Sequence, residues 1–151
     1  MKVTLIPKGA RIEKAEVSAV FLVGFIGEKI VACRNERGWD IPGGHLEEGE
    51  EPMDGLRREA EEEAGVYFMG AMPYLKISLP NSLPGESKYR GKYMLFFVSD
   101  SCALGEFIPK PDAFERELFN VETFIERYHG DKITLKVLRD LIQKAEEYLG
   151  E

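Results

Sequence analysis

The chain has 151 residues, 44% of them hydrophobic, and a formal net charge of −7 at neutral pH. This length and composition are typical of one folded domain, so we expect a single domain over residues 1–151. The acidic balance disfavours broad binding to nucleic acid or to anionic membranes, and we expect neither partner. It does not exclude a small anionic substrate that binds together with a divalent cation.

The two cysteines, Cys33 and Cys102, form neither a C-x-x-C pair nor a disulfide framework. Reduced thiols are typical of cytosolic proteins. The N-terminal segment has no apolar stretch of signal-peptide length, and no segment reaches the ~18 apolar residues of a membrane span. We therefore expect a soluble, cytoplasmic protein, and a homodimer is compatible with the sequence.

The first half of the chain predicts a β-hairpin followed by a loop. Residues 16–25 (EVSAVFLVGF) are rich in β-branched and aromatic side chains, which favours a buried strand. A glycine-containing turn leads to a return strand over residues 29–34. Residues 35–44 are interrupted by glycine and proline and predict a loop.

A helix is predicted over residues 52–64, because both of its ends carry boundary signals. Pro52 suits the first helical turn, where its missing N–H is not needed. Gly65 suits the left-handed position just beyond the last turn. Gly55 lies inside the helix and costs about 1 kcal/mol relative to alanine, so we expect another part of the chain to approach closely there.

The second half of the chain predicts strands and a final helix. Residues 66–79 and 92–100 are strand-like, with a polar loop over 81–92 between them. Residues 105–128 begin as a proline-broken loop and end in a short strand or a turn of helix. Leucines at helical spacing predict an amphipathic helix over residues 134–149. The order of elements predicts an α/β sandwich with a mixed sheet between helices.

The predicted helix over residues 52–64 carries an unusual group of carboxylates. Glu59, Glu62 and Glu63 have i, i+3 and i+4 spacing, which places them on one helix face with Cβ atoms roughly 5–6 Å apart. Their mutual repulsion is relieved by a divalent cation such as Mg²⁺ or Mn²⁺, which prefers hard oxygen ligands. The alternative is a solvated acidic face that Arg57 and Arg58 neutralise in part.

The surrounding residues favour the metal-binding alternative. From Gly44 to Val66 the chain reads G-x5-E-x7-R-E-A-x-E-E-x-G-V. This segment resembles the signature box of the Nudix hydrolases, G-x5-E-x7-R-E-U-x-E-E-x-G-U, in which U is a bulky aliphatic residue. Every fixed glycine, glutamate and arginine is present, and Ala60 departs from the usual aliphatic residue. The preceding segment, GWDIPGG, is similar to the loop before this box in MutT-like members.

The resemblance implies a Nudix-type α/β/α sandwich and a metal-dependent pyrophosphohydrolase. In such enzymes water attacks a phosphorus of a nucleoside diphosphate linked to another moiety. The implied cofactor is Mg²⁺ or Mn²⁺. The implied metal ligands are the carboxylates of Glu59, Glu62 and Glu63 and the backbone carbonyl of Gly43. The implied catalytic residues are Arg58, Glu59 and Glu62.

Within this box, the resemblance also suggests how roles are divided. Arg58 is expected to hold the carboxylates in register through charge-assisted hydrogen bonds. Glu59 acts as a metal ligand, as the general base, or as both. Glu50 is expected to tie the preceding loop to the helix. A further acid outside the box often completes such a site, and Asp112 and Glu115 are the candidates, with solvated loop charges as the alternative.

Substrate contacts are predicted from residue type alone. The candidates are Arg34, Arg37, Trp39, His45, Lys88, Arg90, Lys92, His129 and Asp131. The cations suit phosphate groups, and Trp39 could stack on a base, although a buried anchor beneath the loop is favoured for this side chain. Asp131 precedes the last predicted helix and is equally suited to capping it.

Four functional classes fit these features. The leading hypothesis is a Nudix pyrophosphohydrolase, with a nucleoside triphosphate as one candidate substrate. The second is a Nudix-fold nucleotide-binding or regulatory domain without catalysis. The third is a prenyl-diphosphate isomerase, for which Cys33 would be the catalytic cysteine. The fourth is a calcium-binding or acidic interaction module, which would bind metal without turnover.

Overall fold

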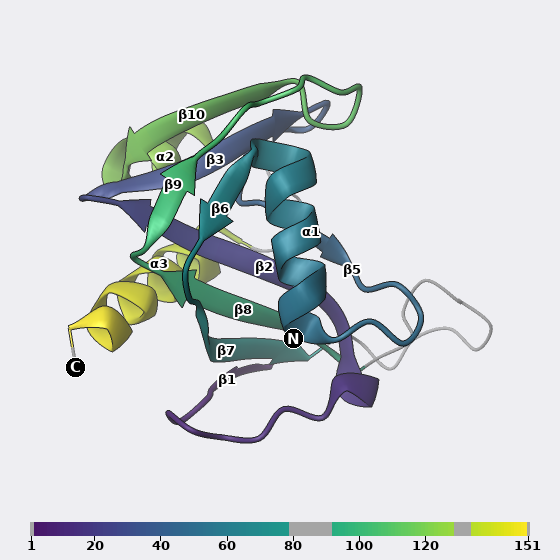
Figure 1. Ribbon diagram of the computed structural model, residues 1–151. Helices are drawn as coiled ribbons and strands as arrows, with labels where there is room; N and C mark the ends of the chain where they lie inside the picture. Colours follow the sequence, from purple (N-terminus) through teal and green to yellow (C-terminus); the bar gives the residue numbers. More distant parts are fainter. Residues whose placement is uncertain (1, 79–91, 129–133, 151) are drawn as a thin grey trace.

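The computed structural model of the protein describes residues 2–78, 92–128 and 134–150 (Figure 1). Four of the candidate substrate contacts, Lys88, Arg90, His129 and Asp131, lie outside the described residues. Lys92, at the start of the second described segment, is exposed, and its backbone N–H donates to the backbone oxygen of Glu16 at 2.7 Å.

A mixed β-sheet forms the centre of the described structure. Its strands run in the order β1 (Val3–Leu5), β7 (Met72–Ser78), β8 (Tyr93–Ser99), β2 (Val17–Ile26), β3 (Lys29–Asn35), β10 (Glu115–Asn120). The central pair, β2 and β8, is parallel, and the other pairs are antiparallel. Two short strands extend this sheet: β4 (Gly38–Asp40) pairs with β3, and β5 (Gly43–His45) pairs with β2. A separate two-stranded ribbon consists of β6 (Val66–Phe68) and β9 (Cys102–Leu104).

Helices cover both faces of the sheet (Figure 1). Helix α1 (Pro52–Ala64) packs on one face, and helices α2 (Val121–Arg127) and α3 (Leu135–Leu149) pack on the other. A short 3₁₀ helix, η1 (Lys14–Glu16), precedes β2. The predicted α/β/α sandwich with a mixed sheet is therefore confirmed. None of the described helices is both long and apolar enough to cross a membrane.

Strand β2 is buried on both faces, which explains its continuous apolar sequence. Val20 and Leu22 point to the core beneath α1, where they meet Leu56. Phe21 and Val23 point to the opposite core beneath α3. This alternation follows from the period of two in a strand.

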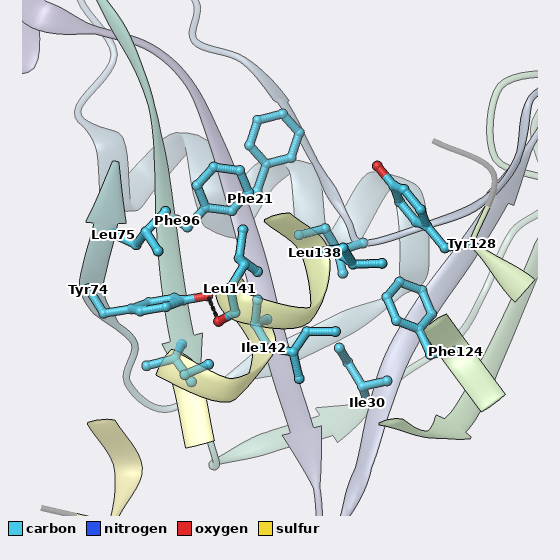
Figure 2. Close-up of a cluster of buried hydrophobic side chains, with 14 of the residues drawn as sticks. Phe21, Ile30, Tyr74, Leu75, Phe96, Phe124, Tyr128, Leu138, Leu141 and Ile142 are labelled. Atoms are coloured by element: carbon cyan, nitrogen blue, oxygen red, sulfur yellow. Dashed lines mark hydrogen bonds between the residues drawn. The ribbon is translucent and has the colours of Figure 1, made fainter. Parts of the chain in front are cut away.

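The core on the α3 side holds the final helix against the sheet (Figure 2). The rings of Phe21 and Phe96 stack with their centroids 5.1 Å apart. The buried hydroxyl of Tyr74 donates a hydrogen bond of 2.9 Å to the backbone carbonyl of Leu141. This bond satisfies a polar group that would be costly to bury alone, and it ties α3 to β7.

Two sequence-based boundaries need correction. Residues 35–44, predicted as a loop, contain β4 and part of β5, because these short segments pair with β3 and β2. The strand-like stretch 66–79 divides into β6 and β7. Between them the chain turns at Gly70. The backbone N–H of Gly70 donates to the Ser101 hydroxyl, and this hydroxyl donates to the backbone oxygen of Gly70.

Helix α1 has the predicted bounds, and the structure explains why glycine stands at positions 55 and 65. Gly65 has a φ of 60°, and its N–H donates to the carbonyl oxygens of Ala60 and Glu61. At Gly55 a Cβ would lie 2.2 Å from a methyl carbon of Leu46 and 3.0 Å from a carboxylate oxygen of Glu50. The expected close approach at Gly55 is therefore present.

Replacement of Gly65 by alanine is expected to destabilise the protein more than replacement of Gly27. Both residues have left-handed φ angles, of 60° and 62°, so alanine costs about 1–2 kcal/mol at either position. At Gly65 a Cβ would also lie 2.4 Å from the backbone oxygen of Glu106, whereas at Gly27 it would meet nothing within 4 Å. Urea unfolding should show a further loss of roughly 1–3 kcal/mol for Gly65→Ala. Equal losses for the two variants would contradict the close contact at Gly65.

Candidate active site

The candidate site lies where strand β5 faces helix α1. At Gly44 a Cβ would lie 2.8 Å from the carboxyl carbon of Glu59, so a side chain at this position would displace that carboxylate. The neighbouring Gly43 donates its backbone N–H to Glu63 Oε1 at 2.8 Å. The two glycines therefore let the backbone of β5 come close to the acidic face of the helix.

Arg58 joins the acidic residues to one another. Its Nε and Nη2 donate to the two carboxylate oxygens of Glu50, both at 2.9 Å, in a bidentate pair. Its Nη1 donates to Glu59 Oε1 at 2.9 Å and to Glu62 Oε2 at 3.4 Å. Nη2 also donates to the backbone oxygen of His45 at 3.2 Å. One guanidinium thus contacts the loop before the helix, strand β5 and two residues of the helix face.

The loop is held to the helix by Glu50. Besides its pair with Arg58, this carboxylate accepts a hydrogen bond of 3.0 Å from the backbone N–H of Glu47. The hydrogen bonds from Arg58 lower the pKa of Glu50 below its ordinary value. The carboxylates of Glu50 and Glu59 hold the pKa of Arg58 above its ordinary value, so the ion pair between Arg58 and Glu50 stays fully charged.

Glu59 has a different electrostatic environment. Its side chain is 13% exposed, compared with 49% for Glu62. Burial raises the pKa of Glu59, and the nearby charges of Glu62 and Glu50 act in the same direction, while Arg58 opposes them. These effects shift Glu59 toward its protonated form relative to a free glutamate, and a bound divalent cation would act in the opposite direction.

Whether this site fits a divalent cation depends on which oxygen atoms of the box glutamates are available as ligands. The acidic side chains make their contacts to Arg58 and Gly43, and no three metal-ligating side chains of the described residues converge as they stand. Glu59 and Glu62 each use one carboxylate oxygen in these contacts, and the other accepts no hydrogen bond from a described residue. Carboxylate oxygens are the ligands that Mg²⁺ and Mn²⁺ prefer. The residues present therefore fit such an ion, with Glu59 and Glu62 able to rotate their second oxygen toward it.

The candidates outside the box are placed as follows. Arg34, a predicted phosphate contact, forms a 2.7 Å ion pair with Glu115, a predicted extra acid. Asp112 is exposed in the turn between Lys110 and Ala113. Among the described residues, neither acid joins the box glutamates in a group of three or more metal-ligating side chains.

Two further candidates lie near the β3–β4 hairpin. Arg37 is exposed, and its backbone N–H donates to Asn35 Oδ1 at 2.8 Å. Trp39 is half-buried, and its ring packs edge-on against Phe119 with centroids 4.9 Å apart. This packing favours the anchoring role of Trp39 over base stacking.

Sequence reasoning missed two contributions to this site. The backbone oxygen of His45 accepts a hydrogen bond from Arg58, and backbone groups leave no signature in side-chain patterns. Lys110 and Arg116 bind backbone oxygens at the end of α1. They come from a segment far along the chain, and nothing near the box indicates them.

The chain belongs to the NUDIX domain family, whose sequence model matches residues 14–141. Among curated proteins, it is 29% identical over 108 residues to a protein from Bartonella henselae named RNA pyrophosphohydrolase, a match that covers 62% of each chain. A protein of the same name from Zymomonas mobilis is 35% identical over 80 residues, covering 45% of this chain and 52% of the relative. The chain spans between 39% and 62% of the length of the curated relatives that it matches.

Solved structures share the fold. The pyrophosphohydrolase of Bacillus subtilis superimposes with a TM-score of 0.64 at 17% identity, covering 97% of this chain and 90% of that one. A MutT structure, from work on Aliivibrio salmonicida and Vibrio cholerae, gives a TM-score of 0.62 at 18% identity, covering 83% of this chain and 94% of that one.

Replacement of Arg58 by methionine is expected to destabilise the metal-free protein. The change leaves two poorly exposed carboxylates, Glu50 and Glu59, without their counter-charge, which should lower the free energy of unfolding by about 2 kcal/mol or more. Urea unfolding in EDTA measures this loss. The matched control is Arg139→Met, which removes an exposed 3.4 Å pair with Glu122 and should change stability by no more than about 0.5 kcal/mol. Equal effects of the two substitutions would refute the central role of Arg58.

Proposed function

We propose that the protein is a metal-dependent pyrophosphohydrolase that acts on a nucleotide-type substrate, with water attacking a phosphorus of the phosphoanhydride. The observation that carries the proposal is the arrangement of the box carboxylates. Glu50, Glu59 and Glu62 surround Arg58, and Glu63 accepts a hydrogen bond from Gly43 of β5. Membership of the NUDIX domain family supports it. The thiols of Cys33 and Cys102 agree with a cytoplasmic location.

A bound Mg²⁺ or Mn²⁺ would neutralise phosphate charge and make bound water more acidic. The residues that would hold it are Glu59, Glu62 and Glu63, with the carbonyl of Gly43 as a further ligand. Glu59 is also proposed as the general base, because one of its carboxylate oxygens bonds Arg58 and the other accepts no hydrogen bond from a described residue. Arg58 would keep the carboxylates in register while the loop at Glu50 stays fixed to the helix.

The names of the relatives guide the choice of substrate. The four curated relatives are named RNA pyrophosphohydrolase, whereas several solved structures with this fold are named MutT. We therefore propose the 5′-triphosphate end of RNA as the first candidate and a free nucleoside triphosphate as the second. The first departs from the expectation that nucleic acid is not a partner. An acidic protein can still bind an RNA end if it contacts the terminal phosphates through metal rather than the whole strand.

The other functional classes have less support. A prenyl-diphosphate isomerase would need an accessible catalytic cysteine, but Cys33 is only 4% exposed on β3, with its Sγ 3.7 Å from the backbone oxygen of Asp40. A regulatory Nudix domain often lacks box glutamates, and none is missing here. A calcium-binding or acidic interaction module would bind metal without turnover, so hydrolysis distinguishes it from the proposed enzyme.

Neutralising Glu59 or Glu62, two of the proposed metal ligands, should greatly reduce turnover. Glu59→Gln and Glu62→Gln are each expected to lower the rate by well over the ~10-fold loss that outer-shell partners of metal sites produce. The matched control is Glu61→Gln on the same helical turn, where the carboxylate accepts a hydrogen bond from the Tyr67 hydroxyl. Phosphate release is measured with Mg²⁺, with Mn²⁺ and with EDTA. Turnover that survives in EDTA, or that falls equally in all three variants, would sink the proposal.

The substrate is tested with RNA carrying a 5′-triphosphate, GTP, oxidised dGTP, ADP-ribose and a dinucleoside polyphosphate. We expect the RNA end to be converted to a 5′-monophosphate with the highest kcat/KM. A higher kcat/KM for a free nucleotide would select the second candidate. An absence of metal-dependent turnover across this panel, with Mn²⁺ still bound, would favour the binding-domain or interaction-module class.

A further inference from the structure

Two cations from a distant segment bind the C-terminal end of helix α1. Lys110, in the connection between β9 and β10, donates from Nζ to the backbone oxygen of Glu62 at 2.9 Å. Arg116, on β10, donates from Nη1 to the backbone oxygens of Ala64 at 3.0 Å and Gly65 at 3.3 Å. The same nitrogen donates to the backbone oxygen of Gly105 at 2.9 Å, so it also joins the helix end to the connection itself.

This arrangement meets a physical need of the helix. The last carbonyl groups of any helix lack partners within the helix and carry partial negative charge. The last turn of α1 contains no basic residue of its own, and it carries the acidic side chains of Glu61, Glu62 and Glu63. Cations from elsewhere in the fold therefore supply both the hydrogen bonds and the positive charge.

Arg116 is the more rigidly placed of the two cations. It lies on β10 opposite Cys33 of β3, within the main sheet. Its guanidinium carbon lies 5.4 Å from the centroid of the Phe107 ring, and at Gly65 a Cβ would lie 3.0 Å from its Nη1. The side chain is partly buried, and its contacts fix the guanidinium in one place. The end of α1 is thereby attached to the sheet.

We propose that Arg116, assisted by Lys110, is a positioning residue for the candidate metal site. By holding the last turn of α1 against the sheet, it sets the position of Glu62 and Glu63 relative to Gly43 on β5, to which Glu63 is hydrogen-bonded. Loss of this contact lets the last turn of α1 fray and spreads the carboxylates over several positions. The proposal rests on the proposed function, because it assigns these carboxylates to metal binding.

The test compares three variants of the whole chain. Arg116→Met removes all donors, and Arg116→Lys keeps a cation with three donors. The matched control is Arg57→Met, since Arg57 also donates to a backbone oxygen, that of Phe68 at 2.8 Å, and lies over an aromatic ring, with its guanidinium carbon 4.5 Å from the Phe68 ring centroid. Arg57 is on the same helix, but its side chain donates to the backbone oxygens of Phe68 and Met69 rather than to those of the last turn.

Three measurements separate positioning from simple stabilisation. Mn²⁺ affinity, measured by calorimetry, should fall about 10-fold in Arg116→Met, the loss typical of residues that orient metal ligands. Amide hydrogen exchange should become faster at residues 61–65. In the active enzyme, kcat should fall while the KM for substrate stays within about twofold. Arg116→Lys should recover most of the Mn²⁺ affinity. Arg57→Met should have the Mn²⁺ affinity of the wild type, even if this variant melts at a lower temperature.

The outcomes distinguish this proposal from the proposed function. If the wild type binds Mn²⁺ but hydrolyses nothing, the proposed function fails, and Mn²⁺ affinity and hydrogen exchange still test the role of Arg116. If Arg116→Met melts at a lower temperature but keeps the wild-type Mn²⁺ affinity, Arg116 is only a stabilising residue and the positioning role is overturned. A wild type that binds no Mn²⁺ overturns both proposals.

Discussion

The hydrogen bonds and ion pairs of Arg58 are the constraint on which the rest of the candidate site depends. A helix face with several glutamates repels itself, and the repulsion grows where the side chains are shielded from water. A guanidinium has five N–H donors in a fixed plane, so one residue can contact Glu50, Glu59 and Glu62 together and still reach a backbone oxygen. Lysine has fewer donors and no planar fork, so it could not make all of these contacts at once. The arginine thereby fixes both the distance between α1 and β5 and the arrangement of the acids.

The two ends of α1 are held by different parts of the chain. Near the first turn, Gly55 leaves room for Leu46 and Glu50, so the loop after β5 packs directly on the helix. At the last turn, Lys110 and Arg116 bind the backbone oxygens. Between these ends, Leu56 and Ala60 are fully buried against the sheet. Ala60, which departs from the usual bulky residue of the box, is therefore a core residue in this protein too.

Much of this arrangement could be predicted from local sequence. Pro52 and Gly65 define the limits of α1 because their conformational preferences act over one turn, and the apolar run in β2 reflects burial on both faces. The fixed spacing of the box likewise identifies the acidic face of the helix, because residues three and four apart share a face in any α-helix. The short strands β4 and β5 could not be predicted, since three residues are too few to show a period.

The long-range contacts could not be predicted, for a different reason. Arg34 and Glu115 are far apart in the chain, so their ion pair follows only from the pairing of β3 with β10. The contacts of Arg116 with the end of α1 have the same origin. Such contacts depend on tertiary structure, and a single sequence records the residues without recording which segments meet. For the same reason, residue type alone does not show which of the candidate substrate contacts lie near the box, and those assignments stay predictions.

The parallel pairing of β2 with β8 has a consequence for how the molecule is assembled. The whole acidic box, with α1, β6 and β7, lies in the stretch of chain between these two central strands. During synthesis, β2 cannot form its pair with β8 until β8 has been made. Pairing of strands so far apart in the chain is a long-range step of the kind that slows folding. A nascent chain that ends before β8 already contains every glutamate of the box, but it lacks the strand beside β2 that completes the platform under the helix. Until β8 is present, the apolar face of α1 lacks Leu95 and Phe97, which share a core with Leu56 and Ala60 in the folded protein.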